Sequence, residues 1–197
     1  MISATGIYGL LRRSYHAHVS KPGARYRTLY TGRDVRLRVR ELADEIVRDA
    51  GQRPPRICII AEGARRFGST LRAALRERGL EAESVEVRAR RTRGQVLLPV
   101  ELDGPPAAEF EGEDVLVVDD IADEGRTLNA VLSYIREGKP SRLMSAVLVD
   151  KRERRVEDIQ IDYIGFEVAQ GWVIGFGMDL DGEYRDLDEI AVLSPER

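Results

Sequence analysis

The most informative stretch of this sequence is VLVVDDIADEGRTL, which begins at Val115. An apolar run leads into two adjacent acids, Asp119 and Asp120, a third acid follows at Asp123, and a Gly-Arg-Thr triplet comes soon after. Grouped carboxylates accept hydrogen bonds from hydroxyl groups or bind a cation, whereas a glycine and a threonine at the start of a helix favour an anion. The stretch therefore predicts a ligand with hydroxyls and a phosphate, such as a sugar phosphate.

The elements around this stretch alternate between strands and helices. Continuous apolar runs predict strands at 57–61, 115–121 and 143–149, and alternating apolar and polar residues predict one at 82–88. Apolar residues at helical spacing predict helices at 34–49, 67–75 and 128–135. Because most of these strands are apolar throughout, we expect an α/β fold, with a mainly parallel sheet covered by helices on both faces. Ligands of such sheets bind beyond the carboxyl ends of the strands, where Asp119 and Asp120 lie.

The two ends of the chain differ from the central α/β core, which we assign to residues 33–155. Residues 1–32 lack clear periodicity and predict an irregular arm, while residues 156–197 predict short strands broken by turns. We expect this β-rich segment to form a smaller appendage. His16 and His18 are the only histidines and would share one face of a strand, but the absence of a third ligand nearby argues against a metal site there.

Composition excludes several classes of protein. The 31 Lys and Arg nearly balance the 34 Asp and Glu, giving a formal net charge of -3, which argues against a general nucleic-acid binder. The single cysteine, Cys58, cannot form an internal disulfide, and we expect it to be buried in its apolar strand. No segment approaches membrane-spanning length and no signal-peptide-like region is present, so we expect a cytoplasmic location.

The stretch VLVVDDIADEGRTL resembles the phosphoribosyl-diphosphate (PRPP) binding signature of type I phosphoribosyltransferases. The shared pattern is an apolar strand, two acids, two spacer residues, a further acid and a Gly-x-Thr loop. The resemblance implies that Asp119 and Asp120 meet the 2′ and 3′ hydroxyls of the ribose. It also implies a 5′-phosphate loop made of Glu124, Gly125, Arg126 and Thr127. Capping of the following helix would account for Asp123 and Glu124 alone, but it leaves the acid pair unexplained.

The downstream sequence resembles the 6-oxopurine, or hypoxanthine-guanine, branch of that family. The similar segments are LVDKRERR and DYIGFEVAQGWVIGFGMDLDGEYRDLDEIAVL. The resemblance implies that Asp123 is the general base or acceptor near purine N7 and that Lys151 reaches the 6-oxo group. It further implies that Trp172 stacks on the base and that the Val173 carbonyl meets the ring N1–H or a 2-amino group. Without the resemblance, Lys151 could be an ordinary surface lysine and Trp172 a partly buried core residue.

Two further residues of the tail and a metal follow from the same resemblance. Asp179 matches the family's magnesium-linked acid, and Arg185 matches the arginine that approaches pyrophosphate. The implied cofactor is Mg²⁺, near Asp179, Asp119 and Asp120, because magnesium takes phosphate oxygens with few carboxylates. Pairing with neighbouring charges in a polar turn is the alternative for Asp179 and Arg185.

The chain departs from the family at three positions. The family usually has Thr or Ser where this chain has Glu124. Its pyrophosphate loop, often with a non-proline cis peptide, corresponds here to AEGA, in which Gly63 keeps the close backbone approach but Glu62 is acidic. Arg65 and Arg66 could supply the missing positive charge, or could simply lie exposed at a helix start.

The third departure is the mobile lid, where the family has a Ser-Tyr pair. This chain instead has a basic segment with four arginines at positions Arg88, Arg90, Arg91 and Arg93. They could clamp pyrophosphate, or form a solvated basic loop. No aromatic residues interleave with them, which argues against an RNA-binding surface.

Together these features predict a type I phosphoribosyltransferase fold with a small hood formed from the arm and the tail. The implied enzyme transfers phosphoribose from PRPP to hypoxanthine or guanine in purine salvage, as a homodimer or homotetramer. Two alternatives remain open: a transferase for xanthine or another base, and a non-catalytic nucleotide-binding regulator with the same fold.

Overall fold

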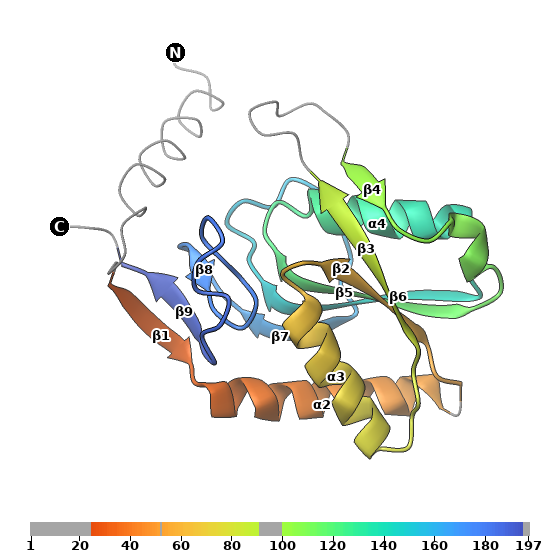
Figure 1. The fold of residues 1–197 in the computed structure, drawn as a ribbon, viewed down its shortest axis with the longest axis horizontal. Helices are drawn as coiled ribbons and strands as arrows, with labels where there is room; N and C mark the ends of the chain where they lie inside the picture. Colours follow the sequence, from red (N-terminus) through yellow and green to blue (C-terminus); the bar gives the residue numbers. More distant parts are fainter. Residues whose placement is uncertain (1–24, 52, 91–99, 195–197) are drawn as a thin grey trace, which may run out of the picture.

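The main body of the protein is a six-stranded sheet, and all neighbouring strands pair in parallel except the edge strand β4 (Figure 1). The computed structural model describes residues 25–51, 53–90 and 100–194. In spatial order, the sheet contains β4 (Glu101–Asp103), β3 (Ser84–Arg90), β2 (Arg56–Ala61), β5 (Asp114–Ala122), β6 (Arg142–Asp150) and β7 (Tyr163–Glu167). The predicted parallel α/β sheet is thereby confirmed.

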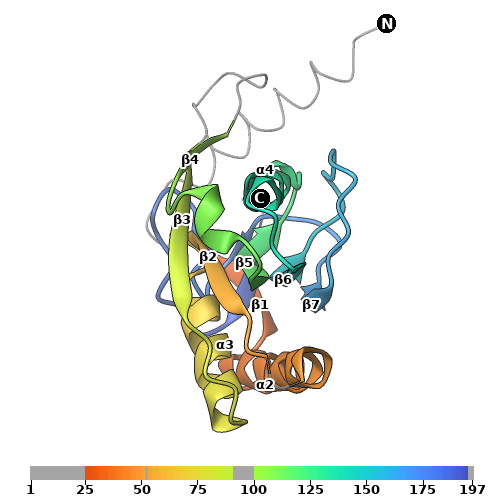
Figure 2. The ribbon, with the colours of Figure 1, turned by 90° about the vertical axis from the view of Figure 1, so that its right-hand side faces the viewer.

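Helices cover both faces of the sheet, as predicted (Figure 2). They are α2 (Gly32–Ala50), α3 (Arg65–Glu77) and α4 (Arg126–Glu137), with a short 3₁₀ turn, η1, at Ala107–Phe110. The alternation of side chains along β5 explains the layers. Leu116 and Val118 pack with α2 and α3, whereas Val115 and Val117 pack with α4 on the opposite face. Both faces of the strand are buried, so every position of the run is apolar.

Helix α2, the longest within the described residues, begins with a capping box. The Thr31 hydroxyl accepts a hydrogen bond from the Asp34 N–H at 3.3 Å, and Asp34 Oδ2 accepts one from the Thr31 N–H at 2.9 Å. The Thr31 hydroxyl also donates to Oδ2 of Asp34 at 2.6 Å, and this bond, together with that from the Thr31 N–H, holds the pKa of Asp34 below its usual value. The helix therefore begins at Gly32, two residues before the position that apolar spacing predicted.

A small antiparallel sheet forms the hood and joins sequence-distant strands. Its order is β1 (Tyr26–Tyr30), β9 (Ile190–Leu193) and β8 (Val173–Ile174). The Ser194 N–H extends the pairing by donating to the Arg25 carbonyl at 2.9 Å. The end of the predicted irregular arm is thus a strand, because its backbone pairs with the distant tail strand β9, and local periodicity does not reveal such pairing. His16 and His18 lie outside the described residues.

Strand β7 belongs to the main sheet, unlike the other strands of the tail segment. It pairs in parallel with β6, where Ala146 lies opposite Tyr163. The Arg38 guanidinium of α2 donates to the carbonyls of Ile164, at 2.8 Å, and Gly165, at 3.0 Å. This side chain occupies carbonyls that an edge strand would otherwise present to solvent.

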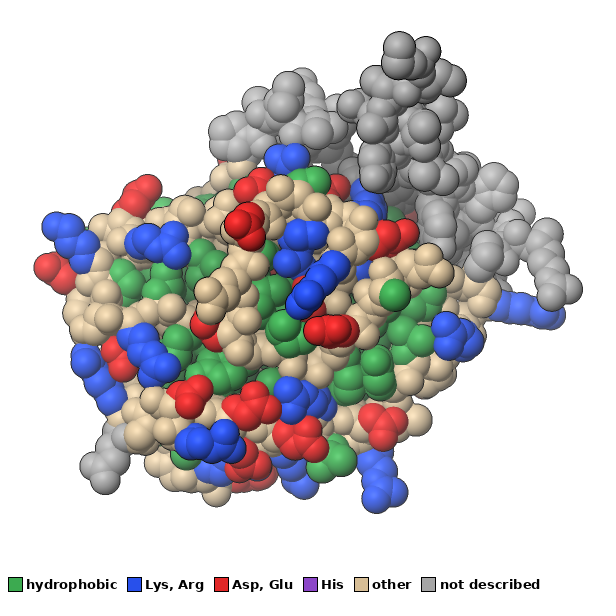
Figure 3. All heavy atoms as spheres, turned by 180° about the vertical axis from the view of Figure 1, so that it is seen from behind, with side chains coloured by type: hydrophobic (Ala, Val, Ile, Leu, Met, Phe, Trp, Pro, Cys, Tyr) green, Lys and Arg blue, Asp and Glu red, His purple; other side chains and the backbone are tan. Residues whose placement is uncertain are grey.

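The surface carries charges of both signs. On the face opposite that of Figure 1, Lys and Arg side chains lie among Asp and Glu side chains instead of gathering into one region (Figure 3). Within the residues that the structure describes, no helix has the length and apolar character needed to cross a membrane.

Candidate functional site

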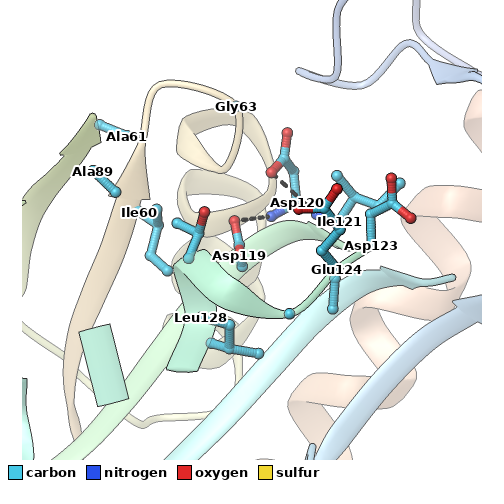
Figure 4. A pocket seen from close by; sticks show the side chains of 13 residues that line it. Ile60, Ala61, Gly63, Ala89, Asp119, Asp120, Ile121, Asp123, Glu124 and Leu128 are labelled. Atoms are coloured by element: carbon cyan, nitrogen blue, oxygen red, sulfur yellow. Dashed lines mark hydrogen bonds between the residues drawn. The ribbon is translucent and has the colours of Figure 1, made fainter. Parts of the chain in front are cut away.

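The main pocket lies beyond the carboxyl ends of β2 and β5, at the start of α4 (Figure 4). Its volume is about 260 Å³. From the β2 side it is lined by Ile60, Ala61 and Gly63, with Ala89 from β3. The remaining lining residues are Asp119, Asp120, Ile121, Ala122, Asp123, Glu124, Gly125, Thr127 and Leu128. Most of the stretch that the sequence singled out therefore faces one cavity.

The two adjacent acids are held by their own backbone. Asp119 is buried, and its Oδ1 accepts a hydrogen bond from the Asp120 N–H at 3.0 Å. The Asp120 Oδ1 accepts one from the Ile121 N–H, also at 3.0 Å. Burial raises the pKa of Asp120 above its usual value, and hydrogen bonds from Asp119 and the backbone offset part of that rise. The pair is thus fixed in orientation before any ligand arrives.

The loop after β2 packs directly on the second acid. A Cβ atom built on Gly63 would lie 1.9 Å from Oδ2 of Asp120, so only glycine allows this approach. The Ala61–Glu62 peptide bond is cis, as the resemblance implied for this loop. The Glu62 side chain is largely exposed, and its Oε1 lies 3.8 Å from Nη1 of Arg65.

The candidate phosphate loop is the segment Glu124–Thr127 at the start of α4. Gly125 is the N-cap of the helix and has a φ of 84°, a left-handed conformation that favours glycine. The first backbone N–H groups of a helix lack partners within it and carry the positive end of the helix dipole. Thr127 adds a side chain to the wall of the pocket. The loop therefore offers the backbone geometry of an anion site.

The acid in this loop is balanced by two arginines. Oε1 of Glu124 lies 3.3 Å from Nη2 of Arg154, and Oε2 lies 3.6 Å from Nε of Arg126. The Glu124 side chain is only 21% exposed, so its charge is paired close to where an anion would sit. The two arginines therefore offset much of the repulsion that the Glu124 charge would exert on an anion in this loop.

Lys151 and Asp123 form a pair beside the pocket. Lys151 follows β6 directly and is 5% exposed, and its Nζ lies 3.4 Å from Oδ1 of Asp123. That oxygen is buried and accepts no hydrogen bond from the described residues. The second oxygen, Oδ2, lies 3.7 Å from Nη1 of Arg154. A buried acceptor beside two cations is suited to a ligand N–H group.

A second pocket, of about 420 Å³, opens on the other side of the loop after β2. Its lining residues are Glu62, Gly63, Arg65, Arg66, Gly177, Arg185 and Asp186. Arg65 forms two hydrogen bonds of 2.8 Å with Glu86, and the Arg66 guanidinium lies 4.6 Å from the centre of the Phe176 ring. Both arginines therefore line the cavity while already held by other groups.

The remaining predicted residues cluster in the hood. Nη2 of Arg185 lies 2.8 Å from Oδ1 of Asp179, and Oδ2 of Asp179 accepts a hydrogen bond from the Gly182 N–H at 2.7 Å. The half-buried Trp172 donates its Nε1–H to the Asp179 carbonyl at 3.3 Å, and Val173 is buried in β8. Five predicted residues do not line either pocket: Arg126, Lys151, Trp172, Val173 and Asp179.

The basic lid segment is placed only in part. Strand β3 extends to Arg90, two residues beyond the predicted strand, so Arg90 is an exposed strand residue like Arg88 and not a loop residue. The pairing with β4 extends the strand, and a short strand at 101–103 leaves little periodic signal. Arg91 and Arg93 lie outside the described residues.

Three residues near the pocket had not been singled out from the sequence. Asp150 is 1% exposed, Arg154 contacts Asp123 and Glu124, and Arg155 donates to the Ala122 and Asp123 carbonyls. The available signal was the charged run DKRERR directly after a buried strand. Spacing alone does not tell which of its arginines turns inward.

Comparisons with known proteins agree with this geometry. The phosphoribosyl transferase domain family matches residues 26–181. The hypoxanthine-guanine phosphoribosyltransferase of Aquifex aeolicus is 33% identical over 174 residues, covering 85% of this chain and 94% of the relative. That of Bacillus subtilis is 30% identical over 173 residues, covering 86% and 93%.

Solved structures of phosphoribosyltransferases have a similar fold. A hypoxanthine phosphoribosyl transferase of Trypanosoma cruzi superposes with a TM-score of 0.81 at 30% identity, covering 88% of this chain and 94% of that one. A hypoxanthine-guanine phosphoribosyltransferase of Bacillus anthracis superposes with a TM-score of 0.77 at 27% identity, covering 87% and 98%. The family match, the similar fold and the arrangement of the pocket together show that this chain belongs to the type I phosphoribosyltransferases.

Proposed function

We propose that this phosphoribosyltransferase moves 5-phosphoribose from PRPP to a 6-oxopurine, hypoxanthine or guanine, releasing pyrophosphate and forming IMP or GMP in purine salvage. One observation carries the proposal: the Lys151–Asp123 pair, at 3.4 Å, lies beside the pocket that holds the Asp119–Asp120 pair. A cation beside a buried acceptor suits a base with a carbonyl and a neighbouring N–H. Adenine, which has an amino group at that position, would meet the Lys151 ammonium unfavourably.

The proposed base site uses residues from both sheets. Lys151 donates to the 6-oxo group, and Oδ1 of Asp123 accepts the N7 proton. Trp172 stacks on the purine ring and the Val173 carbonyl accepts from N1–H or from a 2-amino group. Trp172 donates to the Asp179 carbonyl at 3.3 Å, so its ring is held at the hood.

The proposed PRPP site follows the two pockets. Asp119 and Asp120 bind the ribose hydroxyls, and the 5′-phosphate rests on the amides of Gly125, Arg126 and Thr127 with the hydroxyl of Thr127. The Glu124 backbone completes this loop, while its carboxylate stays with Arg154. In the second pocket, the backbone of Glu62 and Gly63 and the side chain of Arg185 meet pyrophosphate, since that pocket contains all three.

The carboxylates of the site fit a magnesium ion that arrives with PRPP. Within the described residues no group of three or more potential metal ligands exists, and Mg²⁺ takes only one or two carboxylates when phosphates and water supply the rest. Asp119, Asp120 and Asp179 are the residues that would hold it. When bound, the ion neutralises charge that develops on the leaving pyrophosphate.

In the proposed reaction, purine N9 bonds to C1′ as the bond between C1′ and the pyrophosphate oxygen breaks. Asp123 accepts the N7 proton, so that the attacking ring does not become cationic. Asp119, Asp120 and the phosphate loop hold the ribose in line with the base, and this orientation supplies much of the rate. The reaction would occur in the cytoplasm, in a homodimer or homotetramer.

A second candidate is a nucleotide-binding regulator without catalysis. The acid at Glu62 favours it, because a carboxylate on the pyrophosphate loop repels the leaving group. A transferase for xanthine or another base is the nearest enzymatic alternative.

The test is to follow pyrophosphate release from PRPP and Mg²⁺ with hypoxanthine, guanine, xanthine and adenine in turn. We expect turnover with hypoxanthine and guanine and little with adenine. A preference for xanthine or adenine would show that this base, and not hypoxanthine or guanine, is the substrate. Tight IMP binding without turnover on any base would establish the regulator instead.

A further inference from the structure

The candidate phosphate loop is held from behind by a neighbouring segment, which we name the clamp and define as residues 150–157. It begins at Asp150, the last residue of β6, whose Cα lies opposite that of Ala122 in β5. The N–H groups of Val156 and Glu157 both donate to the Glu124 carbonyl, at 3.1 and 3.2 Å. The clamp and the loop therefore form one hydrogen-bonded unit.

Arg155 makes the central contacts of this unit. Its Nη2 donates to the Ala122 carbonyl at 2.8 Å, and its Nε donates to the Asp123 carbonyl at 3.0 Å. The same Nη2 donates to Oδ1 of Asp150. One guanidinium thus joins two consecutive carbonyls just before the phosphate loop to the end of β6, a geometry that its planar set of donors allows.

The pair at the centre of the clamp is buried. The Asp150 side chain is 1% exposed and that of Arg155 is 17% exposed. The loop also packs tightly on this side chain, since a Cβ built on Gly125 would lie 3.1 Å from Cδ of Arg155. Removing Arg155 would leave the Ala122 and Asp123 carbonyls without this donor, and removing Asp150 would leave a largely buried guanidinium without its carboxylate, so the backbone before the loop would have to move.

We propose that Arg155, oriented by Asp150, is a positioning residue that fixes the backbone between the acid pair and the start of α4. It touches neither substrate nor metal in this proposal. It acts through the carbonyls of Ala122 and Asp123, and so sets both the Asp123 side chain and the amides that receive the 5′-phosphate. Since Asp150 directly precedes Lys151, the same contact links the base site to the phosphate site. The inference rests on the proposed function for its kinetic consequences only.

Arg152 provides a matched control. It also bonds to Asp150, with its Nε 2.7 Å from Oδ2, but it is 67% exposed and its other ion-pair partner is Glu167 on β7. Arg152→Ala therefore removes a guanidinium from the same carboxylate without removing a contact to the loop.

The experiment compares Arg155→Ala, Arg155→Lys and Arg152→Ala by hydrogen exchange of peptides that cover 122–128, without ligand. We expect exchange in this segment to rise at least about tenfold in both Arg155 variants and to stay unchanged in Arg152→Ala. Lysine keeps a charge for Asp150 but cannot span both carbonyls, so it remains informative if the alanine variant does not fold. Unchanged exchange in a folded Arg155→Lys would overturn the proposal.

Ligand binding supplies a second readout, in which IMP is compared with inosine. We expect the Arg155 variants to lose most of the affinity gained from the 5′-phosphate, about tenfold or more, while inosine binding changes little. Equal losses for both ligands would mean a purely structural role and would also overturn the proposal. If the wild-type chain turns over no purine, the proposed function fails, yet the exchange measurement still decides the role of Arg155.

Discussion

Nζ of Lys151 lies 3.4 Å from Oδ1 of Asp123, and this contact joins the loops that follow two neighbouring strands. Lys151 is buried at the end of β6, and Asp123 follows β5 at the edge of the pocket. Each charge is therefore compensated by the other, and in the proposed function a bound base would meet both. The contact makes distinct predictions for the two side chains.

Asp123→Asn keeps the shape of the side chain and removes its ability to accept a proton. We expect kcat to fall by about 100-fold or more, and the Kd for IMP to stay within about threefold. Pyrophosphate release and calorimetry with IMP measure the two quantities. Asp44→Asn, which changes an exposed acid of α2, should affect neither. An unchanged kcat in Asp123→Asn would remove this residue as the base.

Lys151→Met removes the cation but keeps a long apolar stem. We expect the KM for hypoxanthine to rise about tenfold or more, because a charged hydrogen bond to the 6-oxo group is lost, while the KM for PRPP changes little. Lys139→Met, at an exposed site after α4, is the control. A rise confined to the KM for PRPP would place Lys151 in the phosphate site instead.

Gly63→Ala tests the packing of the β2 loop on the acid pair. The added Cβ would lie 1.9 Å from Oδ2 and 2.5 Å from Cγ of Asp120, so the loop or the carboxylate must shift. We expect kcat/KM for PRPP to fall by about 100-fold. Gly112→Ala strains a left-handed φ of 69° with no atom nearby, and should lower the Tm without lowering activity. Comparable activity losses in both variants would show that stability, and not the site, is responsible.

Glu124→Gln tests the acid in the phosphate loop. Amide oxygen still accepts from Arg154, and the charge next to the 5′-phosphate disappears. We expect the KM for PRPP to fall about threefold at low ionic strength, and this gain to shrink as salt screens the repulsion. Glu137→Gln, at the far end of α4, is the control. A higher KM would show that the Glu124 charge is needed to orient Arg154.

Cys58 predicts a difference in alkaline stability. Burial raises the pKa of its thiol from 9.0 to about 12. Because the folded pKa is higher than the unfolded one, the contribution to stability is complete below about pH 9 and is lost as the pH rises toward 12. Between these values, urea unfolding of the wild type should lose up to about 1.4 kcal/mol per pH unit more than unfolding of Cys58→Ala. Parallel pH profiles would contradict this assignment.

Long periodic elements could be predicted from the sequence, and short ones could not. The run around Val117 is apolar at every position because both faces of β5 are covered. The strand and the helices on both of its faces could therefore be predicted. Strand β1 could not be predicted, since Tyr26–Tyr30 is mostly exposed and forms a strand only through its pairing with β9. Strand β7 was recognised as a strand, but its partner, β6, lies across a long connection that local pattern does not specify.

Among the site residues too, those in a contiguous motif could be predicted and those placed by the fold could not. The residues between Asp119 and Thr127 were predicted because a contiguous motif carries them. The roles of Arg154 and Arg155 could not be predicted, because two adjacent arginines in a charged run differ only in the direction that the folded backbone gives them. Arg154 meets the side chains of Asp123 and Glu124, whereas Arg155 meets backbone carbonyls.

The pairing of β1 with β9 also constrains the order in which the molecule can be built during synthesis. Tyr26 lies opposite Leu193 in that pair, so the first described strand leaves the ribosome long before its partner exists. The strands from Arg56 to Glu167 can associate earlier, because each already has its neighbours. The hood, with Trp172 and Asp179, must therefore be the last part to assemble, and a nascent chain would acquire its candidate phosphate loop before the hood residues that we propose to contact the purine.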